Sequence, residues 1–288
     1  MAKRLLPAKV HRYWYDLASA GLPEVPLIGV HKLLRTEEGL VEHIHPGAME
    51  ICYLQSGRRT YHVRGRDYVM QGNDVFVTFP DEPHGSGRRP HERGLLYWMQ
   101  VILPEKPRTF LGLSPKQGWQ LAKGLRSMPR RFFRGRREMQ TLFEGVFRYP
   151  HPTMTPRESL AAAVRIQMFL LAVIDCSHAG AKKTVTGDVQ RALDFVAANL
   201  EGQIALETLA ETSGLSTSRF KAKFRQQVGL PPGEYVLREK IQRAETFLKT
   251  TDESVTRIAM RLGFGSSQYF ATVFKRFTRK RPGDVRVT

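Results

Sequence analysis

The chain has few cysteines, few acidic residues and no long apolar run. Its two cysteines, Cys52 and Cys176, are too few for the disulfide framework of a small secreted protein and are typical of a reducing compartment. The first seven residues carry charge, but no long apolar segment follows them, so we expect no signal peptide. The longest uninterrupted apolar run, residues 168–174, is too short to cross a bilayer, which predicts a soluble intracellular protein with no membrane partner.

The shortage of acid leaves a large positive charge. The 45 Lys and Arg outnumber the 27 Asp and Glu, and the net charge of +18 favours a polyanionic partner such as nucleic acid. Residues 187–288 hold 17 basic and 11 acidic side chains, whereas residues 106–137 hold ten basic and none acidic. The arginines of that second segment form either a solvated basic face or a sequence-independent phosphate contact. They are Arg130, Arg131, Arg134, Arg136 and Arg137.

One pattern occurs twice in the last hundred residues. The first copy covers residues 206–235 and the second covers residues 255–285. Each copy has a short helix with apolar residues three and four apart, then a glycine, a serine, and a second helix with two phenylalanines at i and i+4. This order is typical of a helix-turn-helix unit, so the sequence predicts two such units in tandem.

The turn in each copy has residues that suit it. Gly214 and Gly263 fall where the chain leaves the first helix, and we expect a positive φ there because glycine has no Cβ. Ser216 and Ser266 follow, and each hydroxyl is expected to accept a hydrogen bond from a free N–H of the next helix.

The outward faces of the two second helices are polar and basic. A single amphipathic helix has a polar face without any special role, but two copies in the same order favour DNA reading. In a major groove Gln can pair with adenine, and Arg or Lys with guanine. The candidate DNA-binding residues are Ser218, Arg219, Lys221, Ala222 and Arg225 in the first copy and Ser267, Gln268, Ala271, Thr272 and Lys275 in the second.

Over about the last hundred residues the chain resembles the AraC/XylS family of bacterial transcription regulators. The shared positions include Leu209, Ala210, Gly214, Phe220, Phe224, Gly229, Pro232, Tyr235, Ile258, Ala259, Gly263, Phe264, Tyr269, Phe270, Phe274 and Pro282. The resemblance implies two helix-turn-helix units that read adjacent major-groove segments. It also implies a linker helix over residues 232–249, with Leu237, Ile241, Ala244 and Leu248 buried.

Two positions depart from the family pattern. Lys240 stands where the family usually has Arg, and Arg279 replaces the glycine that follows the last helix. A residue with a Cβ is costlier at positive φ, so we expect that helix to end differently.

The first half of the chain follows a different pattern. From about residue 25 to residue 103, short β-type runs alternate with turn signals, at residues 61–63, 68–70, 75–79 and 95–103. Such a series predicts a small β-barrel or jelly roll. Gly39, His43, His45, Glu50 and Gly57, followed by Gly72, Pro80 and His84, resemble the two motifs of the cupin barrel, which place three His and one Glu in one cavity.

The His and Glu set suits either a metal or an organic ligand. His43 and His45 are two residues apart and are expected to share one face of a strand. Three imidazoles and a carboxylate are suitable ligands for a divalent transition metal, so a metal-dependent cupin enzyme or metal sensor is the alternative. By resemblance to cupin sensors of AraC-type regulators, we instead expect His43, His45, Glu50 and His84 to bind a small polar effector, with no cofactor and no catalytic residue.

Tyr97 and Trp98 are neighbours on one strand, so only one of them can face the interior. If Trp98 does, its ring is either ordinary core or a flat surface for a sugar or aromatic acid. We include Trp98 among the effector-binding candidates.

Two helices are expected between the halves, over residues 138–149 and 156–177. The second is apolar on more than one face and therefore packs either against its own barrel alone or also against a partner subunit.

The prediction is an α+β protein with three parts. Residues 1–178 form a cupin-like β-barrel (jelly roll) with a helical dimerisation segment, residues 179–186 a linker, and residues 187–288 an all-α domain with two helix-turn-helix motifs. The family resemblance implies a cytoplasmic, nucleoid-associated bacterial homodimer that binds double-stranded DNA, a sugar-like effector and RNA polymerase, and that activates transcription.

Overall fold

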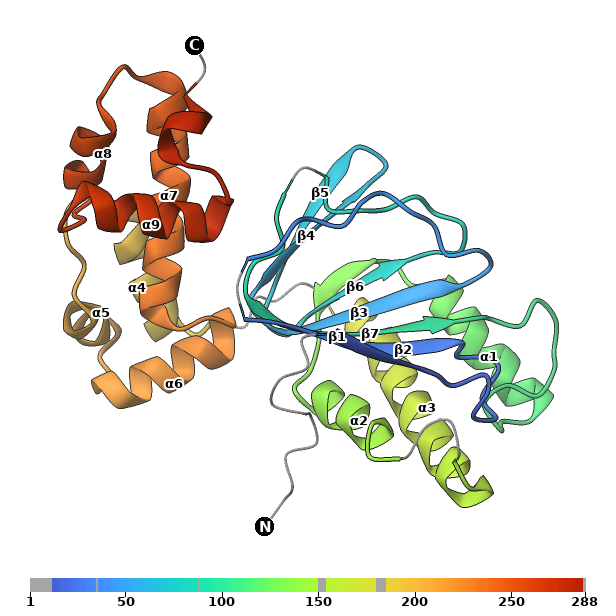
Figure 1. Cartoon of the computed structure of the whole chain (residues 1–288). Helices are drawn as coiled ribbons and strands as arrows, with labels where there is room; N and C mark the ends of the chain where they lie inside the picture. Colours follow the sequence, from blue (N-terminus) through green and yellow to red (C-terminus); the bar gives the residue numbers. More distant parts are fainter. Residues whose placement is uncertain (1–11, 35, 88, 150–153, 180–184, 287–288) are drawn as a thin grey trace. The chain divides into compact units, whose positions relative to one another are not determined.

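A computed structural model describes residues 12–34, 36–87, 89–149, 154–179 and 185–286 (Figure 1). The chain divides into two compact units. The first contains residues 1–34, 39–87 and 93–183, and the second contains residues 184–288 with the short segments 35–38 and 88–92. A sheet-rich first unit and a helical second unit confirm the predicted α+β class. Most of the predicted linker and the start of the chain lie outside the described residues.

An antiparallel six-stranded sheet forms the centre of the first unit. Its strand order is β1-β2-β7-β3-β6-β8, and a second sheet is the hairpin of β4 and β5. The runs that the sequence predicted correspond to β4, β5, β6 and β7, while closure into a barrel stays a prediction. The strands are β1 (Arg12–Asp16), β2 (Leu27–Leu33), β3 (Met49–Ser56), β4 (Arg58–Val63), β5 (Arg66–Gln71), β6 (Asp74–Thr78), β7 (Gly94–Val101) and β8 (Phe132–Arg134).

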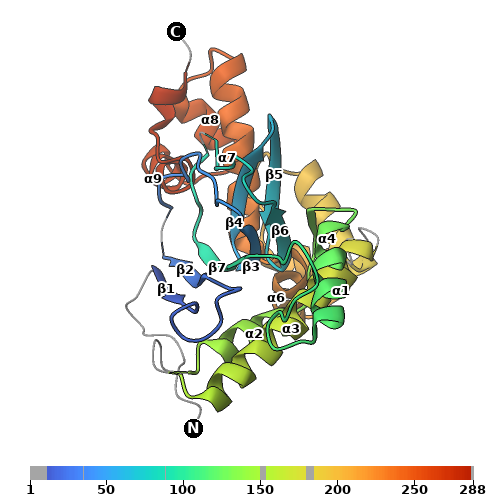
Figure 2. The same cartoon turned by 90° about the vertical axis from the view of Figure 1, so that its right-hand side faces the viewer.

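The two faces of the six-stranded sheet have different environments. Side chains alternate along β3, so Ile51 and Tyr53 point to one face while Glu50 and Cys52 point to the other. The first face packs against helices α1 (Pro115–Arg126), α2 (Glu138–Val146) and α3 (Pro156–His178) in the main core (Figure 1). The hairpin of β4 and β5 lies over the second face, above β3 and β6, in both views (Figures 1 and 2).

Helix α3 is longer and more apolar than the run of residues 168–174 indicated. By length and composition alone its 23 residues could cross a bilayer, which the uninterrupted run of residues 168–174 did not indicate. Polar residues such as Arg165 and Gln167 interrupt the apolar run without interrupting the helix. Such a helix is weak evidence for a membrane span, and here Ile166, Phe169 and Val173 are buried in the core of the unit.

The second unit is built from helices on either side of one long helix. The helices are α4 (Gly187–Ala198), α5 (Leu206–Ser213), α6 (Thr217–Val228), α7 (Pro232–Thr250), α8 (Val255–Arg261) and α9 (Ser267–Thr278), followed by the 3₁₀ turn η1 (Pro282–Val285). One apolar cluster joins α4, α5 and α6, and another joins α7, α8 and α9 (Figure 1). Helix α7 confirms the predicted linker helix, with Ile241, Ala244 and Leu248 buried and Leu237 partly buried.

Candidate functional site

The two turns between paired helices have the predicted glycine geometry. Gly214 after α5 has φ = 68° and Gly263 after α8 has φ = 70°. In each copy the N–H after the glycine donates a hydrogen bond to a carbonyl of the first helix. Leu215 N–H donates to Ala210 O (3.1 Å), and Phe264 N–H donates to Ala259 O (3.0 Å). Both turns therefore end the first helix in the same way.

The serine caps differ between the copies. The Ser266 hydroxyl accepts a hydrogen bond from the Tyr269 N–H at 3.1 Å, which confirms the predicted cap of α9. Ser216 occupies the N-cap position of α6, but its side chain makes no capping hydrogen bond, so the prediction for Ser216 was wrong. The backbone φ is −62° at Ser216 and −160° at Ser266, so the two side chains are oriented differently relative to the helix that follows.

Pairs of phenylalanines fix the buried faces of α6 and α9. Phe220 and Phe224 are fully buried with ring centroids 5.3 Å apart, and Phe270 and Phe274 are fully buried with centroids 5.6 Å apart. The remaining face of each helix is turned away from its own apolar cluster.

Most of the candidate base-reading side chains lie on those outward faces. Gln268 has an oriented side chain, because the Ser267 hydroxyl bonds to its Oε1 at 3.3 Å. Contact of these residues with bases stays a prediction. Exposed are Ser218, Arg219, Lys221, Ala222 and Arg225 on α6 and Gln268, Thr272 and Lys275 on α9, while Ser267 and Ala271 are half-buried.

The structure adds two outward residues that the sequence interpretation omitted. Tyr269 is 52% exposed, and Arg276 is exposed on the same helix. Positions 269, 272 and 276 follow the three-and-four spacing of one helix face, and this spacing was the signal that could have found them. Lys223 is excluded from that role, because its amine bonds to the Asp188 carboxylate of α4 and this bond lowers the pKa of Asp188.

The C-terminal end of α9 also departs from expectation. Arg279 has φ = 61° and its N–H bonds to Lys275 O at 2.9 Å, so the helix ends in the left-handed conformation despite its Cβ. The prediction that this helix ends differently was wrong. Lys240, the other departure, is buried and donates a hydrogen bond to Gly202 O, and burial lowers its pKa.

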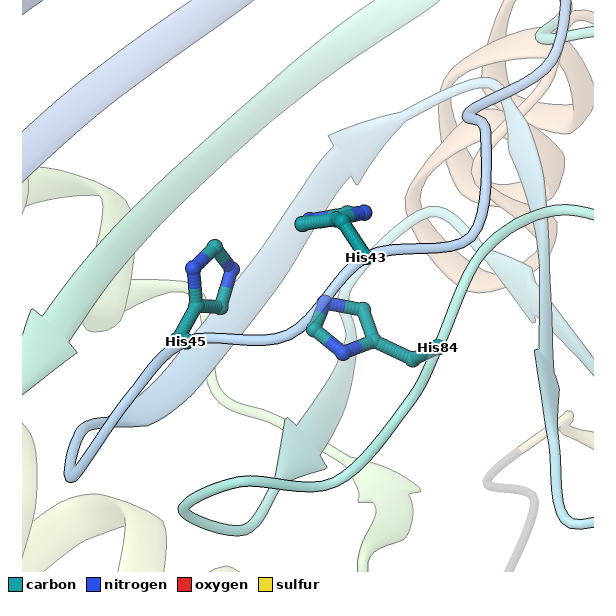
Figure 3. Close-up of side chains that lie close together, drawn as sticks. All are labelled: His43, His45 and His84. Carbon is teal, nitrogen blue, oxygen red and sulfur yellow. The ribbon is translucent and has the colours of Figure 1, made fainter.

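A cluster of three imidazoles lies in the first unit. His43 and His45 lie in the segment before β3 rather than on a strand, so the predicted reason for their shared face was wrong. Two backbone hydrogen bonds of 3.0 Å each pair His43 with His84 and bring the two segments together. The rings point toward one another, with centroids 4.3 to 5.0 Å apart, and one nitrogen from each ring lies within 4.8 Å of the others (Figure 3).

Glu50 on β3 completes this cluster. Its Oε1 lies 3.3 Å from His45 Nε2 and its Oε2 lies 3.6 Å from His84 Nε2. Burial disfavours the charged carboxylate, but the adjacent His45 and His84 outweigh it and lower the pKa of Glu50 to about 2. Burial lowers the pKa of His43. Burial also disfavours the charged form of His84, but hydrogen bonds to Glu50 and to the Glu82 carbonyl outweigh it and raise the pKa of His84. The predicted effector-binding histidines and Glu50 are therefore together in space.

Each imidazole is also held by its second nitrogen. His43 Nδ1 bonds to Val41 O and His84 Nδ1 bonds to Glu82 O, both at 2.9 Å, while His45 Nδ1 lies 3.0 Å from the Gln100 amide. A carbonyl partner makes Nδ1 of His43 and His84 the donor, so Nε2 carries the lone pair when the ring is neutral.

Neighbouring strands extend the polar lining around Glu50. The register pairs Glu50 with Gln100 on β7 and with Thr78 on β6, so the three side chains form a row across the face. Thr78 is buried, and its hydroxyl has no hydrogen-bond partner among the described residues. Sequence reasoning missed Gln100 and Thr78 because their place beside Glu50 depends on the strand order.

Trp98 lies in the next row on the same face. Trp98 pairs with Cys52 in the strand register and packs against the apolar cluster between the six-stranded sheet and the hairpin of β4 and β5, which includes Cys52 and Phe76. Tyr97 instead stacks on Phe143 of α2, with ring centroids 5.3 Å apart. One aromatic faces each side, as strand alternation requires. Gly29 on β2 makes room for Trp98, because a Cβ there would lie 2.4 Å from the indole ring.

Comparison with known proteins matches the two halves separately. A sequence model of the helix-turn-helix domain family matches residues 209–287, and one of the cupin domain family matches residues 33–99. The HTH-type transcriptional activator RhaS of Enterobacter sp. (strain 638) is 38% identical over 84 residues, which are 29% of this chain and 30% of that protein. The chain thus spans less than a third of the length of the curated relatives it matches.

Solved structures of DNA-binding domains are also similar. A transcriptional regulator with an AraC-type DNA-binding domain from Chromobacterium violaceum is 25% identical, covering 34% of this chain and 88% of that chain with a TM-score of 0.33. The DNA-binding domain of AdpA, a global transcriptional factor solved with a target DNA, is 27% identical, covering 35% and 91% with a TM-score of 0.34.

Proposed function

We propose that the chain acts as an AraC-family transcription regulator, with a cupin domain in its first half and a helix-turn-helix domain in its second. It binds double-stranded DNA and selects its sequence through the outward faces of α6 and α9. The observation that carries this proposal is that both helix-turn-helix copies in the second unit have a left-handed glycine turn, a buried phenylalanine pair and an exposed polar face.

The two faces read DNA with different chemistry. On α6, Arg219, Lys221 and Arg225 supply cationic donors that suit guanine edges or phosphates. On α9, Gln268 supplies an amide that suits adenine, with Thr272 and Lys275 one turn and two turns further along the same face. Because few acids lie on either face, the surface is not repelled by the phosphate backbone.

The first unit senses a small polar effector. His43, His45, Glu50 and His84 form hydrogen bonds to it, and Trp98 offers an apolar ring surface, an arrangement that suits a sugar or sugar derivative. The effector acts by binding one arrangement of the two domains more tightly than another. The protein functions as a regulator and not as an enzyme.

The remaining assignments follow the family. The effector-sensing domain is residues 1–178, the linker residues 179–186 and the DNA-binding domain residues 187–288. The protein acts in the bacterial cytoplasm, on the nucleoid, as a homodimer. It is an activator that contacts RNA polymerase, consistent with the naming of RhaS as an activator.

The histidine cluster supports a second candidate, a metal-dependent sensor or cupin enzyme fused to a DNA-binding domain. The residues fit a divalent transition metal, because one nitrogen of each imidazole lies within 4.8 Å of the others and the Glu50 carboxylate lies 3.3 Å from His45 Nε2 and 3.6 Å from His84 Nε2. Nδ1 of His43 and Nδ1 of His84 bond to backbone carbonyls, as in many metal-bound imidazoles, which leaves Nε2 as the atom that would bind the metal. His43, His45 and His84 would hold the metal with Glu50, and the metal would supply a Lewis-acidic contact for the ligand.

DNA selection tests the main proposal. Purified full-length protein is incubated with fragmented genomic DNA, and the protected sites are sequenced. We expect a shared site with two adjacent major-groove segments; protection that is independent of sequence would contradict the proposal.

Ligand binding separates the two candidate roles of the first unit. We expect members of a panel of sugars and organic acids to raise the melting temperature of metal-free protein, because a ligand that binds only the folded state stabilises it. Stabilisation by Zn²⁺, Fe²⁺ or Mn²⁺ alone, lost in His84→Ala but kept in the exposed control His178→Ala, would favour the metal site instead.

A further inference from the structure

Within the second unit, the loop between α4 and α5 connects two separate apolar clusters. Leu200 and Ile204 of this loop pack against the α4–α6 cluster. Between them, the Gly202 N–H donates a hydrogen bond of 2.9 Å to the carbonyl oxygen of Arg261, the last residue of α8. Helix α8 belongs to the α7–α9 cluster, and the two clusters share no residue among those that the structure describes. The loop is therefore anchored in one cluster and bonded to the other.

Two cationic side chains add to this contact. Lys240, buried on α7, donates a hydrogen bond from Nζ to the Gly202 carbonyl oxygen. Arg261 Nη2 lies 2.8 Å from Glu201 Oε1 and Arg261 Nη1 lies 2.6 Å from Glu253 Oε1, so one guanidinium pairs with a carboxylate on each side of the contact. Both backbone groups of Gly202 and the side chain of Glu201 thus bond to α7 and α8. We call Glu201, Gly202, Lys240 and Arg261 the loop bridge.

The turn before α9 lies against the same loop. A Cβ on Gly263 would lie 2.1 Å from the Gly202 carbonyl oxygen, so the two backbones are in contact and no side chain separates them. Lys240 Nζ lies 5.9 Å from the ring centroid of Phe264, the residue after this glycine. Because α9 begins at Ser267, directly after this turn, contacts at the turn constrain the position of α9.

Helix α7 is the other connection between the clusters. Val236, near its start, packs in the α4–α6 cluster, whereas Ile241, Ala244 and Leu248 pack in the α7–α9 cluster. A long helix that is held at its two ends can still bend between them. The loop bridge meets α7 at Lys240, between these two sets of contacts. Two connections leave the clusters less freedom to turn relative to each other than one helix would.

We propose that the loop bridge sets the distance and angle between α6 and α9, so that the protein selects DNA sites by the spacing of their two segments. The inference rests on the proposed reading of DNA by α6 and α9, and it adds positioning residues that lie outside both reading faces. Once one helix is bound, the other is presented at an effective concentration that is high only where the second segment lies within its reach. A rigid connection narrows that reach, because the pair is preorganised for one spacing.

Altered spacing tests the proposal. Full-length protein is titrated with a duplex that carries the selected site and with duplexes that have one base pair inserted or deleted between the two segments. Further duplexes keep only one segment. One inserted base pair moves the segments by about 3.4 Å along the helix axis and about 35° around it. We expect the parent to prefer the native spacing by at least about tenfold.

Two variants weaken the loop bridge and leave the reading faces intact. Lys240→Met removes the bond to Gly202 O but keeps an unbranched apolar stem, and Arg261→Met removes both carboxylate pairs from an exposed position. We expect the spacing preference to fall about tenfold in Lys240→Met and about threefold in Arg261→Met, with affinity for single-segment duplexes within about twofold of the parent. Lys240→Arg, which keeps a charged donor, should retain the preference.

Each variant has a matched control on the same helix. Lys249→Met removes an exposed lysine of α7, and Arg257→Met removes an arginine of α8 whose Nε lies 3.6 Å from Glu253 Oε2. Both controls should keep the spacing preference of the parent. Circular dichroism checks that every variant is folded, and if Lys240→Met does not fold, the exposed Arg261→Met decides the test.

Folded Lys240→Met and Arg261→Met proteins that keep the spacing preference of the parent would overturn the proposal. An equal loss of affinity for the full site and for single-segment duplexes would also overturn it, because that result indicates a structural role only. A parent that binds its selected site equally well at all three spacings would remove the inference and leave the DNA-binding function standing. A parent that does not distinguish the selected site from random duplex would instead overturn the proposed function, and this inference with it.

Discussion

Two glycines at equivalent turns of the repeated motif differ in their surroundings. Gly214 and Gly263 have nearly the same φ, 68° and 70°. A Cβ on Gly214 would meet only the Arg191 guanidinium at 3.7 Å, whereas a Cβ on Gly263 would lie 2.1 Å from the carbonyl oxygen of Gly202. Alanine therefore has the same conformational cost at both turns and a steric cost at only one.

The magnitudes follow from this difference. A residue with a Cβ in the left-handed region costs about 1 kcal/mol, so we expect Gly214→Ala to lower the free energy of unfolding by about that amount. At Gly263 the backbone of Gly202 must also move by close to 1 Å, and overpacking of this kind adds about 1–3 kcal/mol. Gly263→Ala should therefore lose about 2–4 kcal/mol.

Urea unfolding of the full chain measures the loss of stability in Gly214→Ala and Gly263→Ala. Circular dichroism at 222 nm follows the helices of both units, whereas fluorescence of the three tryptophans, Trp14, Trp98 and Trp119, follows the first unit alone. The helical transition of the second unit is therefore the part of the circular dichroism signal that changes without a change in fluorescence. We expect both variants to shift the helical transition, Gly263→Ala by more, with the fluorescence transition fixed. Equal shifts for the two variants would refute the reasoning.

Three further predictions concern single side chains. Ser266→Ala should destabilise the second unit by about 1 kcal/mol through loss of the cap to Tyr269, while Ser216→Ala should change it little; equal losses in urea unfolding would contradict the observed caps. Arg279→Gly should stabilise the same transition by about 1 kcal/mol, because it removes a Cβ at φ = 61°, and a lower midpoint would count against this. Arg131→Ala should destabilise the first unit by about 2 kcal/mol because Arg131 Nη1 lies 2.6 Å from the buried Glu82 carboxylate, whereas the exposed Arg136→Ala should be neutral; tryptophan fluorescence would reveal the opposite order.

The sequence predicted the second unit well because its signals are local. Gly214 and Gly263, the phenylalanine pairs and the long α7 all follow from residues within one or two helical turns. Ser216 and Ser266 look alike in sequence, but their backbone φ differs by about 100°, so residue type alone does not predict which serine caps its helix. Arg279 likewise adopts a conformation that its residue type disfavours, so the surrounding turn decides it.

The first unit was predicted less completely because its site is assembled from distant segments. The spacing of His43 and His45 indicated a shared strand face, but the rings meet because backbone bonds join His43 to His84 across the fold. Thr78 and Gln100 flank Glu50 only because β6 and β7 are both neighbours of β3. Composition also did not predict the environment of the arginines in residues 130–137. Arg131 and Arg134 form ion pairs with Glu82 and Asp74, so fewer of these charges are free than the sequence indicated.

The central claim is that exposed side chains of α6 and α9 choose a DNA sequence, beyond the general attraction of positive charge. The most direct measurement is the ratio of affinities for a selected site and for random duplex at fixed salt, for the parent and for Lys221→Ala, Arg225→Ala and Gln268→Ala. Lys249→Ala, an exposed lysine near the end of α7, is the charge-matched control. We predict that the ratio falls about 5- to 100-fold in at least Arg225→Ala and Gln268→Ala and stays constant in the control. Folded variants that all discriminate as sharply as the parent would contradict the account.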